Sequence, residues 1–272
     1  MRIGIAGLGL IGGSLALALR TRHEVVGFDV DASTRRAARD AGVAVAGRLS
    51  ELVPADAAIV ATPLGAVLPT LAELAPLARG TVLLDVSSVR APVDAFAREH
   101  ASGARLVGMH PMAGRSARGF ASASATLLAG HPFLVVPTAS ADAEAMALAG
   151  AVARDAGGVV TVCSAAEHDR IVAVVSALPL LLAAALTIVA DDATRGGLGD
   201  LAGTGFRDTT RLALTPDDLA TALLTANAPQ VVVALARLRT TLDELERAIA
   251  ERDTGVVAAL LSRARKTRAE LQ

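Results

Sequence analysis

The stretch RIGIAGLGLIGGSLALAL, residues 2–19, decides the fold of this chain. A short apolar run leads into closely spaced glycines, and an alanine- and leucine-rich run follows them. Glycines spaced G-x-G-x-x-G between a strand and a helix let the backbone approach a pyrophosphate at the helix N-terminus. The stretch therefore predicts the first strand–turn–helix unit of a dinucleotide-binding sheet. The predicted cofactor contacts of this turn are Gly7, Gly9, Leu10, Ile11 and Gly12.

Two further positions extend the predicted cofactor site. Asp29 ends the second apolar run, 22 residues after Gly7, where an acid can bind a ribose 2′-hydroxyl and repels a 2′-phosphate. This favours NAD over NADP. Thr62 and Pro63 end the run AAIVATP and are expected along the cofactor at the carboxyl edge of the sheet. Each assignment has an alternative. The glycine turn is then needed only for packing, Asp29 is a solvated loop residue, and Thr62 and Pro63 merely end the strand.

The remaining pattern divides the chain in two. Up to residue 164, apolar runs typical of strands alternate with helical runs, which predicts a parallel sheet covered on both faces. From residue 165 only helical periodicity remains, with a glycine-rich break near residues 195–205 and a second long helix over 216–252, capped by Thr215. We expect a doubly wound, Rossmann-type α/β domain (1–164) followed by an all-helical domain (165–272).

Composition excludes several classes of function. The 272 residues carry a formal net charge of −1 and only 2% aromatic residues, without Trp or Tyr, which argues against nucleic acid as a partner. The single cysteine, Cys163, allows no internal disulfide and fits a reducing cytoplasm. It is interpreted as a small buried hydrophobe. No cluster has the spacing of metal ligands, so no metal is expected.

Residues 171–190 form an uncharged run long enough to cross a bilayer. Pro179 interrupts it, and Asp169, Asp191 and Asp192 flank it, with no lysine or arginine asymmetry between its ends. We therefore expect a core or subunit-interface helix and no membrane association. So much apolar helix in about a hundred residues predicts a homodimer formed through the helical domain.

The segment RLVGMHP, residues 105–111, contains the chemical residue that we expect. Ligands of such sheets bind outside the carboxyl ends of the strands, and His110 stands at one of them, followed by Pro111. A histidine there can face the nicotinamide and take a proton from a hydroxyl while hydride passes to the cofactor. The alternative is a capped structural histidine.

Five segments in order, GLGLIGGSLALAL, DVSSVR, GMHPMAG, EHDRIVAVVSALP and GTGFRDTTRLA, resemble the prephenate/arogenate dehydrogenase family. The resemblance implies NAD-dependent oxidative decarboxylation of a cyclohexadienol, prephenate, to 4-hydroxyphenylpyruvate in tyrosine biosynthesis. It places the proton acceptor on His110, a contact to the substrate hydroxyl and nicotinamide on Ser88, and carboxylate binding on Arg211. Arg207 and Asp208 are interpreted as a structural ion pair. The family pair His168 and Asp169 is interpreted as helix capping and domain packing.

Departures from the family pattern leave alternatives open. Family members often carry S-H-L-P-H where this chain reads SALPL, with Ala177 and Leu180 in place of two histidines. An acid frequent after HPMAG is replaced by Ser116, beside Arg115, which favours a keto acid over the ammonium of arogenate. The alternative substrates are arogenate and a modified prephenate such as aminodeoxyprephenate. The alternative of another class is a catalytically lapsed NAD-binding sensor or partner subunit. A β-hydroxyacid dehydrogenase needs an interdomain lysine, whereas the only lysine here is Lys266.

Overall fold

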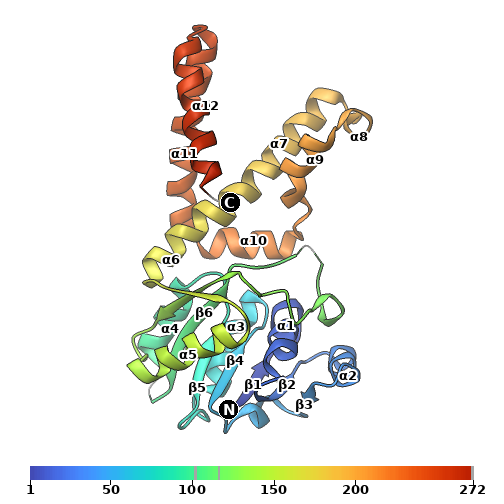
Figure 1. Cartoon of the computed structure of the whole chain (residues 1–272), viewed down its shortest axis with the longest axis vertical. Helices are drawn as coiled ribbons and strands as arrows, with labels where there is room; N and C mark the ends of the chain where they lie inside the picture. The colour runs from blue at the N-terminus through green and yellow to red at the C-terminus, as the bar shows by residue number, and fades with distance from the viewer. Residues whose placement is uncertain (101–102, 116, 271–272) are drawn as a thin grey trace.

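The computed structural model describes residues 1–100, 103–115 and 117–270, and its N-terminal part is built on one eight-stranded sheet (Figure 1). The spatial strand order is β3-β2-β1-β4-β5-β6-β7-β8. The central strands β4 and β5 are buried along their whole length, as their uninterrupted apolar sequence predicts. The strands are β1 (Arg2–Ala6), β2 (Glu24–Phe28), β3 (Ala44–Val45), β4 (Ala57–Val60), β5 (Val82–Asp85), β6 (Arg105–Pro111), β7 (Pro132–Pro137) and β8 (Val159–Val162).

Helices cover both faces of this sheet, which confirms the predicted doubly wound α/β fold. One buried cluster joins Leu15 of the first helix and Val152 of α5 to the strands, and a second cluster joins Leu71 of α3 and Phe96 of α4 to them. The helices are α1 (Leu10–Leu19), α2 (Ala32–Asp40), α3 (Leu64–Leu74), α4 (Ala91–His100) and α5 (Ala143–Asp155), with short 3₁₀ turns at Leu49–Leu52 and Phe120–Ser122.

One strand pairing departs from the all-parallel expectation. β7 runs antiparallel to β6, with His110 opposite Leu134, whereas the other neighbouring strands run parallel. A parallel return needs a crossover, usually through a helix. The described residues between β6 and β7 contain only the 3₁₀ turn Phe120–Ser122, so the chain returns in the opposite direction. Apolar runs alone do not encode strand direction.

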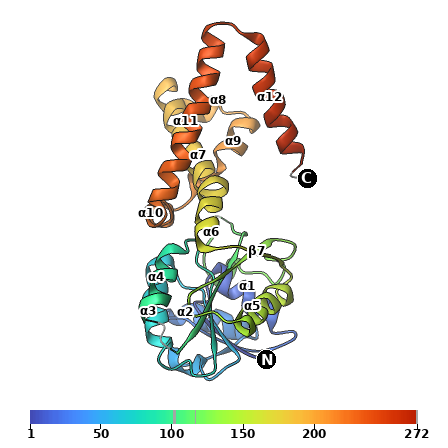
Figure 2. The ribbon, with the colours of Figure 1, turned by 90° about the vertical axis from the view of Figure 1, so that its left-hand side faces the viewer.

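The second part of the chain is all-helical, as predicted, and two of its helices, α11 and α12, extend away from the sheet as an antiparallel pair (Figure 2). A π-helical segment, Ala173–Ala177, joins α6 to α7. A 3₁₀ turn, Arg211–Leu214, precedes α10. The helices are α6 (Ala165–Val172), α7 (Leu178–Thr194), α8 (Leu198–Leu201), α9 (Thr204–Thr210), α10 (Asp217–Ala226), α11 (Ala228–Ala250) and α12 (Thr254–Ala269).

The single helix predicted over 216–252 is wrong. α10 and α11 meet at Asn227 with a bend of 91°. Pro229 has no N–H to donate to the carbonyl of residue 225, and its ring clashes with that carbonyl, so a continuous helix is broken there. The predicted cap is also wrong, because Pro216 occupies the N-cap position of α10 and no side chain caps it.

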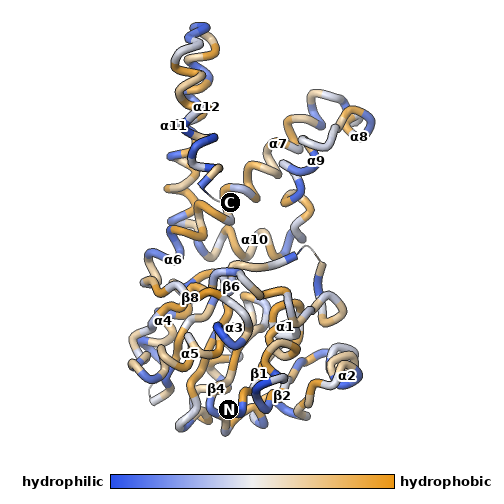
Figure 3. Tube along the Cα trace, viewed as in Figure 1, coloured by the Kyte–Doolittle hydropathy of each residue, from blue (hydrophilic) through white to orange (hydrophobic). Residues whose placement is uncertain are grey.

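The apolar run over 171–190 lies within the helical stretch Ala165–Thr194, the one helix among the described residues that is long and apolar enough to cross a membrane. The first half of this stretch docks on the sheet domain, where His168 and Val172 are buried. Its second half is open, and only 28% of its most apolar window is buried. Hydrophobic residues run along α7 and α11 (Figure 3), and Ile188, Val189 and Val232 are each more than 60% exposed. Burial within the same chain therefore does not explain the outer half of α7.

Candidate active site

The carboxyl ends of β4, β5 and β6 lie side by side and face α6 and α10 (Figure 1). The strand register places Val60 opposite Asp85, and Asp85 opposite Gly108. The segments that leave these strands therefore share one edge of the sheet. Thr62 follows β4, Ser88 follows β5, and His110 is the penultimate residue of β6. Three of the predicted site residues are thus brought to the same edge.

The glycines of the first turn serve two different needs. Gly7 has φ +89°, and a Cβ there would lie 2.6 Å from the carbonyl oxygen of Ala61. A Cβ on Gly12 would overlap the carbonyl oxygen of Gly7. Gly9, the N-cap of α1, meets no protein atom within 4 Å of its Cβ position. The fold therefore requires glycine at positions 7 and 12, whereas the open space over Gly9 and the helix N-terminus fit a phosphate group.

Leu10 and Ile11 open α1, and both lie half-buried directly behind this turn. Asp29 follows β2, where one carboxylate oxygen accepts from the backbone N–H of Leu8 at 2.8 Å and the other from that of Asp31 at 2.9 Å. Asp29 therefore also ties the glycine turn to the end of β2. This fixes its carboxylate beside the turn, at the place expected for a ribose contact.

Thr62 lies against the same turn, since a Cβ on Gly7 would lie 2.9 Å from its backbone nitrogen. Its hydroxyl is buried and has no hydrogen-bond partner among the described residues. Pro63, next to it, is the N-cap of α3. A buried hydroxyl without a partner carries a free-energy cost, which a polar group of a bound ligand relieves. This observation, with the space over Gly9, fits a dinucleotide along this edge.

His110 is held by a relay of two side chains from α6. Its Nδ1 lies 2.9 Å from Nε2 of His168, whose Nδ1 lies 2.8 Å from the carboxylate of Asp169. A carboxylate only accepts, so Nδ1 of His168 carries a hydrogen. When His168 is neutral, its Nε2 accepts the hydrogen that Nδ1 of neutral His110 carries. The lone pair of His110 is then on Nε2. The relay therefore selects the tautomer that can act as a general base.

The charges around the relay favour the same state. Burial of the ring, followed by the neighbouring His168 and Arg90, holds the pKa of His110 well below its ordinary value of 6.5. Burial alone would raise the pKa of Asp169, but hydrogen bonds from His168 and from the backbone of Arg90 and Ala91 keep it below 3.8. At neutral pH the site thus holds a neutral His110 next to a charged Asp169.

The interpretation of His168 as a helix cap is wrong, whereas the structure agrees with its packing role, because its buried ring contacts His110 of the sheet domain. The cap of α6 is instead Ser164, which forms a capping box with Glu167. Asp169 does pack the domains: it accepts from the backbone N–H of Arg90 at 2.7 Å. The side-chain amide of Asn227 donates to the Asp169 carbonyl at 2.8 Å.

The arginines of the helical part differ from expectation. Arg207 donates to the carbonyls of Gly199 and Ala202, and it forms no ion pair with Asp208 within the described residues, so that predicted pair is wrong. Arg211 begins the 3₁₀ turn that precedes α10 and is exposed. No contact recorded for the described residues joins it to His110. Ser88 is half-buried between β5 and α4, and Ser116 lies outside the described residues.

Sequence reasoning missed a buried ion pair next to the relay. The guanidinium of Arg90, 1% exposed, donates to both carboxylate oxygens of Asp85 at 2.6 and 2.5 Å. The two residues frame the segment DVSSVR, in which only Ser88 was assigned a role. The available sequence signal was the pair of opposite charges, Asp85 and Arg90, next to the end of an apolar strand. Their burial could not be predicted, because it depends on neighbouring strands.

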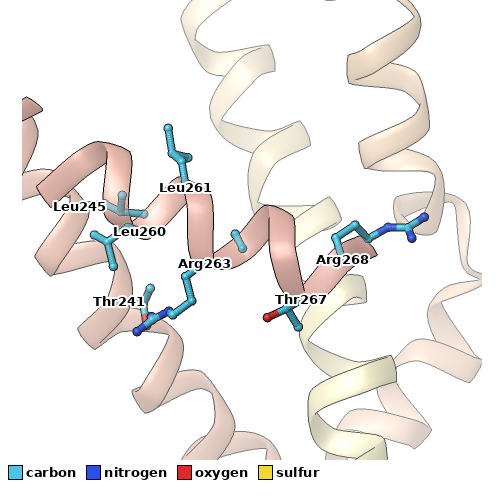
Figure 4. A pocket seen from close by; sticks show the side chains of 8 residues that line it. Thr241, Leu245, Leu260, Leu261, Arg263, Thr267 and Arg268 are labelled. Carbon is cyan, nitrogen blue, oxygen red and sulfur yellow. The ribbon is translucent and has the colours of Figure 1, made fainter. Parts of the chain in front are cut away.

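A hollow of the helical part lies elsewhere. It measures about 460 Å³ and opens between α11 and α12, lined among others by Thr241, Leu245 and Arg263 (Figure 4). Its lining residues all belong to these two helices, so it is separate from the sheet edge that holds His110. Within residues 1–100, 103–115 and 117–270, no three His, Cys, Asp or Glu side chains are grouped as metal ligands.

Comparison with known proteins identifies the family of this chain. Residues 15–162 match the family model of the prephenate dehydrogenase nucleotide-binding domain, and residues 164–263 match that of the prephenate dehydrogenase dimerization domain. The chain belongs to the prephenate dehydrogenase family. The resemblance seen in the five sequence segments is thereby confirmed.

Individual relatives cover this chain to different extents. The prephenate dehydrogenase of Bacillus subtilis is 31% identical over 220 residues, which are 77% of this chain but 59% of that protein. The structure of Synechocystis arogenate dehydrogenase matches with a TM-score of 0.86 and 32% identity over the full length of both chains. Prephenate dehydrogenase from Aquifex aeolicus, solved with hydroxyphenyl propionate and NAD⁺, matches with a TM-score of 0.91 and 25% identity, covering 100% of this chain and 98% of its own.

The two glycine roles can be separated by substitution. Gly9→Ala adds a methyl group that meets no protein atom, so the melting temperature should stay unchanged while NAD affinity falls by about tenfold or more, measured by calorimetry. Gly12→Ala should lower the melting temperature because its methyl overlaps the backbone of Gly7. Gly205→Ala on α9, with equally open space, is the control. Unchanged NAD binding by Gly9→Ala would contradict the placement of the pyrophosphate.

Proposed function

We propose that this protein is an NAD-dependent prephenate dehydrogenase, which converts prephenate to 4-hydroxyphenylpyruvate and CO₂ in tyrosine biosynthesis. One observation carries the proposal: His110 lies at the sheet edge shared with the glycine turn, with its Nδ1 held 2.9 Å from His168. Family membership supports it, and so does the likeness to an Aquifex aeolicus relative that was solved with NAD⁺ and an aromatic acid.

Bound NAD supplies the hydride acceptor. The chain's own residues orient the substrate and handle one proton. We assign the uptake of the 4-hydroxyl proton to Nε2 of His110, as hydride leaves C4 and the ring carboxylate departs as CO₂; the proton then returns to the oxygen of the aromatic product. The positive charge formed on His110 is shared with His168 and compensated by Asp169, since the three side chains are joined by hydrogen bonds. Ser88 is assigned the contact to the substrate hydroxyl.

We favour prephenate over arogenate on charge. Arg115 follows β6 at the sheet edge, and no acid stands in the adjacent position, which suits a keto acid rather than an ammonium group. Ala177, which replaces a family histidine, is buried among apolar residues such as Val231 and Ala234. The second family histidine, which the resemblance implies helps to hold the substrate, is replaced by Leu180, so that contact has no counterpart in this chain. Arogenate and aminodeoxyprephenate remain the competing substrates.

The proposal is tested by offering purified protein NAD with prephenate, arogenate or aminodeoxyprephenate and following NADH formation. We expect turnover with prephenate at the highest kcat/KM. His110→Asn should lower kcat by about 10²- to 10⁴-fold, the usual contribution of a general base, and leave the NAD dissociation constant nearly unchanged. NAD binding without turnover of any of the three substrates would instead favour a catalytically lapsed protein.

The role of Arg211 in binding a substrate carboxylate is a separate proposal. It rests on the family match of the segment FRDTTR and on the exposure of this side chain, which leaves its guanidinium free to meet an anion. Arg211→Ala should raise KM for prephenate by about tenfold or more and change kcat less. Arg207→Ala, which removes bonds to two carbonyls, is the matched control. An unchanged KM for Arg211→Ala would reject the role.

We further propose that the chain has two domains, 1–164 and 165–272, and works as a cytoplasmic homodimer formed through the second. β8 ends at Val162 and α6 begins at Ala165, which supports this boundary. The exposed apolar faces of α7 and α11 support a partner subunit, as does the description of the matching family model as a dimerization domain. A soluble dimer covers these faces and removes the need for lipid.

Sedimentation velocity tests this assembly. The wild-type protein should sediment as a dimer without detergent, and the double variant Val189→Asp/Val232→Asp should dissociate, because it places charges on the exposed apolar faces of α7 and α11. Leu77→Asp, an exposed apolar position of the sheet domain, is the control and should leave the dimer intact. A monomeric wild type, or a requirement for detergent, would contradict the proposal.

A further inference from the structure

Arg90 occupies a place that three separate elements define. Its guanidinium binds both oxygens of Asp85 at the end of β5 and lies against the backbone of β6 at Gly108. A Cβ on Gly108 would be 2.6 Å from the central carbon of the guanidinium, so only glycine admits the arginine there. Gly108 is two residues before His110. The guanidinium of Arg90 therefore packs against the end of β6, the strand that carries the proposed base.

The backbone of Arg90 reaches the relay from the other side. Its N–H and that of Ala91 donate to the two carboxylate oxygens of Asp169 at 2.7 and 2.9 Å. The same carboxylate accepts from Nδ1 of His168, which in turn contacts His110. Arg90 thus binds Asp85 on β5 through its side chain and Asp169 on α6 through its backbone. Hydrogen bonds of Arg90 therefore connect the ion pair to the relay.

We propose that Arg90, anchored by Asp85, is a positioning residue of the active site that holds the Asp169–His168–His110 relay in register and keeps His110 uncharged. The inference rests on the proposed role of His110 as the base and adds the residue that sets its protonation. Arg90 is fully buried and is not assigned any contact with substrate.

The charged and titratable groups around His110 are few. α6 contributes His168 and Asp169; β5 and the segment after it contribute Asp85 and Arg90. On β7 the residue paired with His110 is the apolar Leu134. β8 is followed by Cys163, whose thiol pKa is raised first by burial and then by Glu167, with smaller effects of Arg90 and Asp169. Arg90 is the cation of this set that stays charged at every accessible pH. Its removal should therefore make protonation of His110 easier.

The test follows the titration of His110 by NMR of the histidine rings in the full-length protein, with His110→Asn for assignment. Arg90→Met should move this titration to higher pH, and the acidic limb of kcat/KM should move with it. Arg90→Lys keeps the charge but not the two-pronged bond to Asp85, so the titration should stay near that of the wild type while kcat falls by about tenfold.

Two further variants keep the result interpretable. Asp85→Asn/Arg90→Met removes both charges, so it tests the titration without leaving a buried carboxylate unpaired if Arg90→Met alone unfolds. Loss of the Asp85 carboxylate opposes the effect of losing Arg90, so the titration of His110 should move upward by less than in Arg90→Met. Arg98→Met, which removes an exposed ion pair with Asp94 on α4, should change neither the titration nor kcat.

A titration of His110 that is the same in wild type, Arg90→Met and the double variant would overturn the proposal and reduce Arg90 to a packing residue. The NMR titration needs no substrate, so it remains decisive even if no dienol is turned over. Absence of turnover in the wild type contradicts the proposed function, whereas an unmoved titration contradicts only the role of Arg90.

Discussion

The hydrogen bond between His110 and His168 joins the two parts of this chain at the point where chemistry is expected. The residues are 58 positions apart, one at the end of a strand and the other on the first helix after the sheet domain. Without a hydrogen-bond partner, a histidine at a strand end has no fixed tautomer or ring orientation. Here both are fixed by Asp169, because its carboxylate accepts from His168 and, through the backbone, from Arg90 and Ala91. The contacts that dock α6 on the sheet are therefore the same contacts that orient His110.

Local spacing explains what could be predicted from the sequence. The glycine turn, Asp29 and His110 lie within or next to single strand–turn–helix units, so strand ends and turn chemistry place them without long-range information. His168 and Arg90 could not be placed that way. Their roles depend on which strands lie side by side and on how α6 meets the sheet, as the fit of Arg90 against Gly108 shows. The reversal of β7 and the bend at Asn227 also depend on connections and on a single proline rather than on periodicity.

The long apolar helix serves a divided purpose. Near its start, His168 and Asp169 are polar and buried against the sheet, whereas further along, Ile188 and Val189 are apolar and exposed. Pro179 marks the change: it cannot donate to the carbonyl of residue 175, and the π-helical segment Ala173–Ala177 lies there. A composition-based interpretation treats the helix as uniform. The structure divides it into a half that packs against His110 and a half whose apolar side chains are exposed.

The same π-helical segment bears on the choice of substrate. Ala177 packs with Val231 and Ala234 of α11, so the position where relatives carry a histidine is here part of a small apolar cluster. A ring at this position would need room and a polar partner that this cluster lacks. Ala177 therefore contributes to the packing between α11 and the segment that follows His168. The proposed function assigns recognition of an anionic substrate to arginines such as Arg115 or Arg211, whose delocalised charge suits carboxylates and offers no acceptor for an ammonium group.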